Sequence, residues 1–172
     1  MRRALLLLAL AGCGKSEPPP PDLSWMKETA LLNEWTSAFP MVTRTPVIKG
    51  KLLILEMDRK EVLVGMMKQL PAELRPATKA EVGTLAWLRT TKTPVGQYKK
   101  MGLAGNRDTL EVTLIDVAAR EAFHWHGFDG GMPEKEIRLT KEEMEDARRE
   151  GGISGTAPKD AVLQYLIGLP RN

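Results

Sequence analysis

The amino-acid sequence predicts an α+β fold, in which a mainly antiparallel sheet of four or five strands is covered by an N-terminal and a C-terminal helix. Two observations support this prediction. Apolar residues recur at helical spacing near both ends of the chain, in residues 24–39 and 158–169. Between these segments, apolar runs rich in β-branched residues are separated by turn residues, and residues 109–128 alternate between apolar and polar side chains.

The first element is a helix expected over residues 24–39, which ends before Pro40. One stripe of this helix carries four apolar residues, spaced by seven, three and four positions: Trp25, Leu32, Trp35 and Phe39. The opposite face lacks the richness in Lys and Arg that is typical of helices lying on a membrane surface. We therefore expect the stripe to pack against the core.

Three strands are expected next. Residues 47–57 are apolar and β-rich, and residues 58–60 have the composition of a turn. A returning strand is favoured over a short helix for residues 61–67, because a central glycine weakens a helix and two valines alternate. Residues 82–91 form the third strand, after a loop broken by two prolines. We expect residues 93–107 to be a long, glycine-containing connection.

The most informative segment is a hairpin expected at residues 109–128, with its turn at Ala118-Ala119. The antiparallel pairing that sets Leu114 opposite Phe123 also sets Val112 opposite Trp125, and these apolar side chains then share one buried face. A slip of one residue would mix apolar and polar side chains on both faces, so the alternation specifies the register. The other face receives four polar residues: Glu111, Thr113, His124 and His126.

Two helices are expected in the C-terminal third. Thr140 and Glu143 have the spacing of a capping box, and the helix that they begin ends at Gly151-Gly152. The last helix begins near Pro158, a residue suited to the first turn. Its apolar stripe consists of Val162, Leu166 and Leu169.

The chain begins with a leader of the secretory type. Two arginines precede an apolar run over residues 4–11, which is too short to span a membrane, and small residues precede Cys13. The sequence Leu10-Ala11-Gly12-Cys13 resembles the lipobox of bacterial lipoproteins. The resemblance covers only the start of the chain. It implies that signal peptidase II cuts before Cys13, that the thiol carries a diacylglyceryl group, and that acyl chains such as palmitate anchor the protein. The alternative is an ordinary signal peptide with an incidental cysteine.

The leader defines the expected domain organisation: residues 1–12 are the signal peptide, residues 13–22 are the acylated cysteine and a Pro-rich tether, and residues 23–172 are one globular α+β domain. The proline run of the tether favours extended polyproline II, at about 3.1 Å per residue. Cys13 is the only cysteine, so the domain has no internal disulfide.

The charge of the chain is close to balanced, with 25 Lys and Arg against 22 Asp and Glu, and two of the arginines belong to the leader. Basic residues form no block longer than a pair. A nucleic-acid partner is therefore excluded, since such proteins carry a basic patch.

One set of residues suggests a metal site. On a strand, His124 and His126 point to the same side, and the expected register sets Glu111 opposite His126. Two histidines and a carboxylate make a zinc shell with an open position, to which Asp129 could add a fourth ligand. The alternative is a solvated face without chemistry, and it is favoured because the chain has neither a His-Glu-x-x-His motif nor cysteine spacing of the zinc type.

Two further motifs have simpler explanations. Residues 127–133 could form a backbone nest for an anion, but they contain no Lys or Arg, and a flexible turn is favoured. Ser154 lies between glycines without the Gly-x-Ser-x-Gly spacing of a nucleophile elbow, so a loop with a Thr156 cap is favoured.

The sequence therefore predicts a lipid-anchored cell-envelope protein that acts as a non-enzymatic binding or interaction module, with no catalytic residue and no cofactor. Its expected partners are the membrane and an envelope protein. Gly14 stands where an Asp retains some lipoproteins in the inner membrane, so we expect an outer-membrane anchor facing the periplasm. The alternative function is a metal-binding protein or small metal-dependent hydrolase that uses His124, His126 and Glu111.

Overall fold

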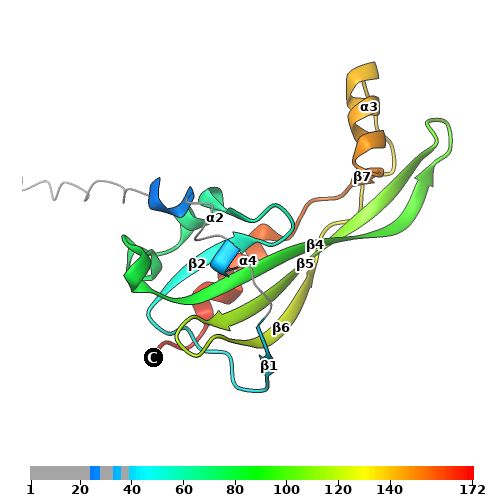
Figure 1. The fold of residues 1–172 in the computed structure, drawn as a ribbon. Helices are drawn as coiled ribbons and strands as arrows, with labels where there is room; N and C mark the ends of the chain where they lie inside the picture. Colours follow the sequence, from blue (N-terminus) through cyan, green and yellow to red (C-terminus); the bar gives the residue numbers. More distant parts are fainter. Residues whose placement is uncertain (1–23, 28–32, 36–38) are drawn as a thin grey trace, which may run out of the picture.

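A computed structural model describes residues 24–27, 33–35 and 39–172 (Figure 1). The leader, Cys13 and the tether lie outside the described residues. The strands are β1 (Met41–Val42), β2 (Lys51–Glu56), β3 (Glu61–Val62), β4 (Val82–Tyr98), β5 (Leu103–Asp116), β6 (Glu121–Asp129) and β7 (Ile153–Ser154). The α-helices are α2 (Val64–Gln69), α3 (Lys141–Arg149) and α4 (Lys159–Gly168), and the 3-10 turns are η1 (Ser24–Lys27), η2 (Ala72–Leu74) and η3 (Lys79–Glu81).

The described residues form a seven-stranded mixed sheet in the order β1-β6-β5-β4-β2-β3, with β7 beside β5. Neighbours β4–β5, β5–β6 and β2–β3 are antiparallel, whereas β2–β4, β1–β6 and β5–β7 are parallel. The prediction of helices combined with a sheet is confirmed, but the prediction of a mainly antiparallel sheet of four or five strands is wrong. One reason is that the chain crosses over through α2 between β2 and β4, which makes these two strands parallel. A second reason is that β1, β3 and β7 have only two residues each, too few to show an alternation of apolar and polar side chains in the sequence.

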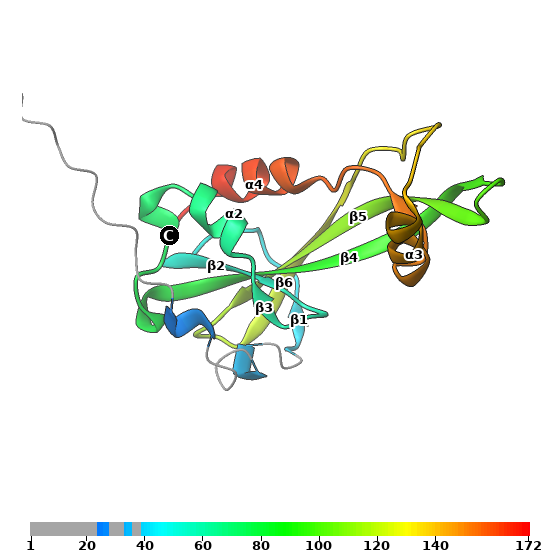
Figure 2. The ribbon, with the colours of Figure 1, turned by 90° about the horizontal axis from the view of Figure 1, so that it is seen from above.

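The core lies on both faces of the central strands. All four residues of the run Leu52–Leu55 in β2 are buried, as a continuous apolar strand in a covered sheet should be. Figure 2 shows α2 and α4 on one side of the sheet and the described N-terminal pieces on the other. On the N-terminal side, Trp87 donates its Nε1–H to the carbonyl of Trp35 at 2.8 Å. The sheet thus has a helical face, which carries α2 and α4, and an opposite face, against which the described residues before β1 pack.

The expected pair of covering helices is found only in part. Of the helix expected over residues 24–39, the structure describes η1, a helical piece at residues 33–35 and the non-helical Phe39, and residues 28–32 and 36–38 lie outside the described residues. At the C-terminal end, α4 buries three residues against the sheet: Val162, Leu163 and Leu166. Beside α4 lies α2, in a segment expected to be a strand.

The strand predicted over residues 61–67 is wrong after Val62, where the chain turns into α2. The sulfur of Met67 accepts a hydrogen bond from the amide of Ile54 at 3.3 Å, and both methionines of α2 are buried. Gly65 faces open space, so the helix places its glycine where no packing is lost. Tertiary burial of the two methionines has overridden the local preference.

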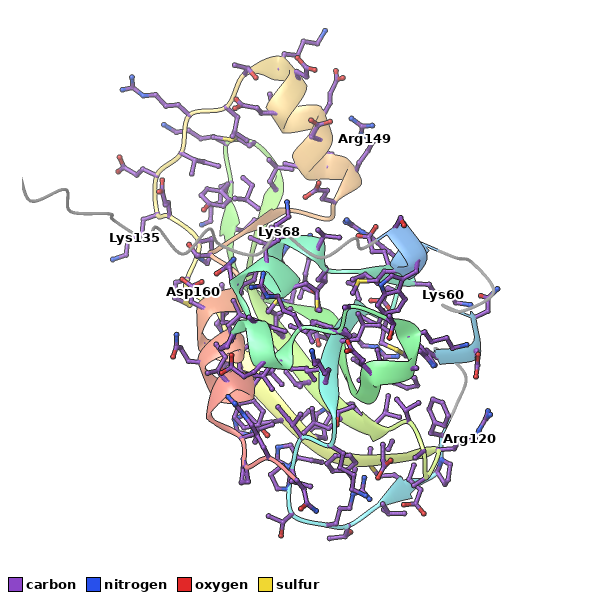
Figure 3. The ribbon with its side chains drawn as sticks, turned by 90° about the vertical axis from the view of Figure 1, so that its left-hand side faces the viewer. Lys60, Lys68, Arg120, Lys135, Arg149 and Asp160 are labelled. Atoms are coloured by element: carbon purple, nitrogen blue, oxygen red, sulfur yellow. The ribbon has the colours of Figure 1, made fainter. Side chains whose placement is uncertain are left out.

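The connection predicted over residues 93–107 is also wrong, because β4 and β5 continue as a paired ribbon that projects beyond the core (Figure 1). The ribbon closes at residues 99–102, where Gly102 has φ of +63°. The β4 half of the ribbon, residues 91–98, is polar and largely exposed, so no apolar alternation marks it as a strand, whereas the β5 half buries Leu103 and Asn106. Figure 3 shows Arg149 on α3, set apart from the main body beside this ribbon.

The predicted helix ends in the C-terminal third are confirmed. The Thr140 hydroxyl accepts from the amide of Glu143 at 3.3 Å, and the Glu143 carboxylate accepts from the amide of Thr140 at 2.7 Å, which completes the capping box of α3. Gly151 follows with φ of +81°. Among the described residues, no helix is both long enough and apolar enough to cross a membrane.

Candidate functional site

The β5–β6 hairpin keeps the predicted register only near its turn. Leu114 lies opposite Phe123 as expected, but the pairing then shifts by one residue. Beyond the shift, Trp125 lies opposite Thr113, His126 opposite Val112, and Gly127 opposite Glu111. The predicted pairing of Val112 with Trp125 is therefore wrong.

The shift is a β-bulge at His124, which has φ of +62°. One extra residue in a strand reverses the direction of every side chain that follows it. Phe123, before the bulge, is 1% exposed, whereas Trp125, after it, is 57% exposed. Apolar and polar residues continue to alternate in the sequence on both sides of the bulge, so the sequence pattern could not predict the bulge.

The two histidines contact α4 instead of forming a fully solvated face. Their rings are stacked at 6.1 Å, and the ring of Tyr165 lies 5.8 Å from His124 and 5.4 Å from His126. Burial, together with the nearby charge of His126, lowers the pKa of His124 below its ordinary value. Burial likewise raises the pKa of Tyr165. This aromatic cluster is part of the packing between β6 and α4.

Glu111 lies on the opposite face of the sheet from the histidines. It is paired with Gly127 and shares a surface groove with Trp125. Asp129 is bonded to the Thr109 hydroxyl at 2.8 Å and lies 3.5 Å from the Arg107 guanidinium. The predicted grouping of Glu111 with the two histidines is therefore wrong. Within the part of the chain that the structure describes, no three His, Cys, Asp or Glu side chains are grouped to hold a metal ion.

The surface around Trp125 is an open groove of about 370 Å³, which we call the Trp125 groove. It is lined by Phe39, Met41, Met57, Trp87, Arg89, Glu111, Thr113, Ala122 and Trp125. Trp87 forms a fixed wall, since its Nε1–H is bonded to Trp35 and its ring lies 5.5 Å from that of Phe39. A groove that is mostly apolar, with a few polar groups, is the usual form of a ligand site.

Trp125 itself lies along its strand. A Cβ added at Gly127 would be 3.7 Å from Cη2 of the indole, so the ring covers the position where a side chain would stand. The indole therefore lies over the strand beside Gly127, at the mouth of the groove. Met41, on β1, forms the other rim and is 60% exposed.

The polar groups of the groove come from two neighbouring strands. Arg89 of β4 and Glu111 of β5 are directly opposite each other, an arrangement that favours opposite charges. Arg89 also lies 3.8 Å from Asp58. The groove therefore offers a ligand one cation and one carboxylate beside its apolar walls.

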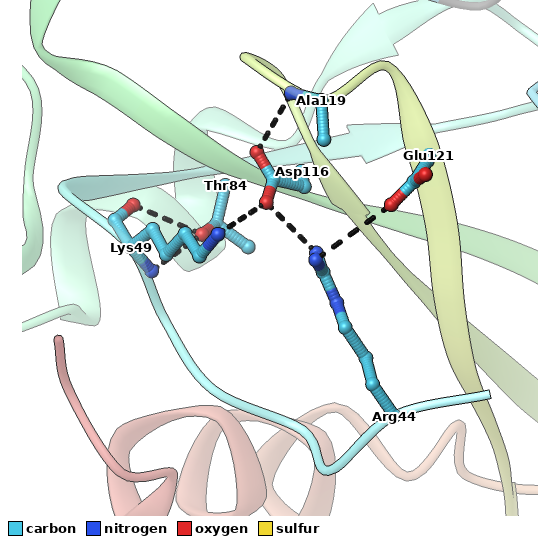
Figure 4. Close-up of polar contacts among 6 residues, drawn as sticks. All are labelled: Arg44, Lys49, Thr84, Asp116, Ala119 and Glu121. Carbon is cyan, nitrogen blue, oxygen red and sulfur yellow. Dashed lines mark hydrogen bonds and ion pairs between the residues drawn. The ribbon is translucent and has the colours of Figure 1, made fainter. Parts of the chain in front are cut away.

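An ion-pair cluster around the buried Asp116 fixes the chain that follows β1 (Figure 4). Asp116 is 1% exposed and accepts from Arg44 at 2.9 Å and from Lys49 at 2.7 Å. Burial alone would raise the pKa of Asp116, but hydrogen bonds from Lys49, the Ala119 amide and Arg44 outweigh it and lower the pKa to about 2. The cluster holds residues 43–50 against the turn between β5 and β6.

The remaining sequence motifs do not form sites. The amides of Gly130 and Gly131 donate to the carbonyls of Asp108 and Thr156, so the predicted turn, and not an anion nest, accounts for these glycines. Ser154 lies in β7, paired with β5. Sequence reasoning missed the groove, and the only signal that could have found it is the pattern of Trp125 followed two residues later by glycine.

Comparisons with known proteins add no assignment, since no protein-family model matches the chain and no curated protein matches it.

Proposed function

We propose that this protein is a lipid-anchored protein of the cell envelope whose globular part is a non-enzymatic binding or interaction module. The leader, the sequence Leu10-Ala11-Gly12-Cys13 and the Pro-rich tether support the anchor. Several acyl chains on a processed Cys13 bind a membrane stably, whereas a single chain does so only marginally. The anchor is in the outer membrane, and the globular part faces the periplasm.

The Trp125 groove is the proposed binding site, and the exposed indole at its mouth is the observation that carries this proposal. Trp125 is 57% exposed and lines the groove together with a second exposed apolar side chain, Met41, so the two form a contiguous apolar surface. Such patches mark surfaces that another molecule covers. Arg89 and Glu111 provide the few polar groups that would orient a bound molecule.

The anchor is tested by replacing Cys13 with Ala in the expressing bacterium. We expect an unprocessed precursor without acyl chains, because the lipid attachment site has been removed. Ser16→Ala is the matched control, since it changes the tether and leaves the lipobox intact. Mass spectrometry that finds an unmodified Cys13 and a mature N-terminus elsewhere would contradict the anchor.

The site is tested in cells by placing a photo-reactive phenylalanine analogue at Trp125 and, as a control, at Met132. Both side chains are exposed, and only Trp125 lines the groove. We expect a discrete cross-linked product from position 125 that position 132 does not form. Equal products from both positions, or none from position 125, would count against the groove as a binding site.

A further inference from the structure

The outer edge of β6 lies beside the Trp125 groove and is only partly covered. In the described residues, β1 is the strand that pairs with this edge, and it pairs with Ala122 and Phe123 alone. The amide of Ala122 also donates to the carbonyl of Pro40 at 2.9 Å. Residues 125–129 pair with β5 on the other side, and Figure 1 shows no strand beside their outer edge. This open edge, residues 124–129, has a length of about 20 Å.

Specific contacts keep the open edge uncovered. After Val42 the chain could continue along β6, but Arg44 reaches back to Asp116 at 2.9 Å and its guanidinium lies 3.8 Å from the ring centre of Phe123. The bulge at His124 interrupts the pairing at the same point. The two-residue length of β1 is therefore a consequence of the ion-pair cluster and the bulge.

Apart from the bulge at His124 and the charge of Asp129, which lie at its two ends, the open edge lacks the protection that natural sheets usually give to their edges. Its sequence, His-Trp-His-Gly-Phe-Asp, contains neither Lys nor Pro. By contrast, the outer part of β4, in the projecting ribbon, carries exposed Lys92 and Pro94. Lysine and proline on an edge strand prevent pairing with another chain. The same sheet thus has one protected edge and one edge that can accept a strand.

We propose that the open edge of β6 and the Trp125 groove together bind an extended peptide segment of another protein by strand addition. Main-chain hydrogen bonds to β6 hold the peptide, and alternate side chains of an added strand face the groove. A bulky apolar side chain of the peptide enters between Met41 and Trp125. This inference rests on the proposed function and names the class of partner.

The shape of the edge favours a peptide over a second copy of the protein. The open edge is bounded at one end by β1, and a single extended segment fits beside it in line with β1. Two copies meeting edge to edge would have to accommodate β1 and the following loop of each molecule alongside β6 of the other. Met41 and Trp125 form the two apolar rims of the groove. An apolar side chain of a peptide that pairs with β6 would point out of the plane of the sheet and could lie between these rims.

The test uses the full-length protein in detergent and a phage-displayed library of random peptides. Enriched peptides are synthesised, and their affinity is measured by fluorescence anisotropy for the wild type and for Trp125→Lys and Met41→Lys. Met132→Lys is the matched control, because Met132 is 63% exposed and lies outside the groove. Hydrogen exchange with and without peptide locates the binding surface.

We expect peptides with a bulky apolar residue, slower exchange of the amides of residues 124–129 on binding, and an affinity about tenfold or more lower for Trp125→Lys and Met41→Lys. Met132→Lys should change the affinity less than about twofold. Thermal unfolding of the variants serves as the folding check. If a variant fails to fold, its affinity is not used, and the hydrogen-exchange pattern of the wild type then shows whether the peptide binds along residues 124–129.

Three results would overturn the inference. The first is that no peptide binds the wild type more tightly than Trp125→Lys. The second is that the protected amides lie outside β6. The third is a dimer in sedimentation that Trp125→Lys abolishes, which would assign the edge to a second copy. Acylation of Cys13 and cross-linking at position 125 do not depend on these results, so failure of the peptide inference would leave the proposed function to its own tests.

Discussion

Replacing Asp116 with Asn should cost the protein stability by an amount that depends on pH. Asp116 is buried and is bonded to both Arg44 and Lys49, and its pKa falls from the ordinary 3.8 to about 2. A shift of nearly two units corresponds to about 2 kcal/mol of stability, at 1.36 kcal/mol per unit. Because the pKa is lowered in the folded state, this stability is present above pH 4 and is lost as the pH falls to about 2.

The assay is chemical unfolding of the wild type and Asp116→Asn at several pH values between 2 and 7. The wild type should be more stable by about 2 kcal/mol or more near neutral pH, and this difference should shrink by about 2 kcal/mol toward pH 2. Glu121→Gln is the control, since Glu121 lies 3.8 Å from the same Arg44 but is more than one-third exposed. Its effect should stay below about 0.5 kcal/mol. A difference between the wild type and Asp116→Asn that does not change with pH would refute the reasoning.

Three further predictions follow from the bulge and the helix cap. Phe123→Ala should lower the free energy of unfolding by about 3–5 kcal/mol because it leaves a cavity, whereas Trp125→Ala should lower it by only about 0.5 kcal/mol, and urea unfolding of both variants checks this. The lowered pKa of His124 means that the unfolded state binds a proton more readily, so stability should fall as the pH drops below about 6.5. Between about pH 7 and 5, His124→Gln should lose less free energy of unfolding than the wild type. An equal loss in both proteins would contradict this prediction. Thr140→Ala should speed hydrogen exchange in α3, at a cost of about 1 kcal/mol, without changing exchange in α4.

The elements that sequence reasoning found are those with a strong local signal. The apolar run of β2 and the stripe of α4 bury the residues that their spacing predicted. The capping box at Thr140 is a local contact between residues three apart, and it formed as expected. In each case the residues that determine the element lie close together in the sequence.

The features that sequence reasoning missed depend on residues far apart. The segment 64–69 is helical because its methionines meet β2, and the projecting ribbon exists because two polar segments pair with each other. The Asp116 cluster joins Arg44, Lys49 and Asp116, and no pattern of neighbouring residues in the sequence predicts that these three side chains meet.

The candidate site was the least predictable part of the molecule. A single extra residue at His124 exchanged the two faces of β6, so the carboxylate assigned to the histidines belongs to the groove, and the tryptophan assigned to the core belongs to the surface. Alternation specifies a register only where the strand has no bulge.

The most direct test of the account is the register of β5 and β6 beyond His124, measured by cross-strand nuclear Overhauser effects in the isotope-labelled protein. With the bulge at His124, we expect backbone contacts from Trp125 to Thr113 and from Gly127 to Glu111. Contacts from Trp125 to Val112 would mean that the strand has no bulge. The indole would then face the core, and both the Trp125 groove and the proposals built on it would be wrong.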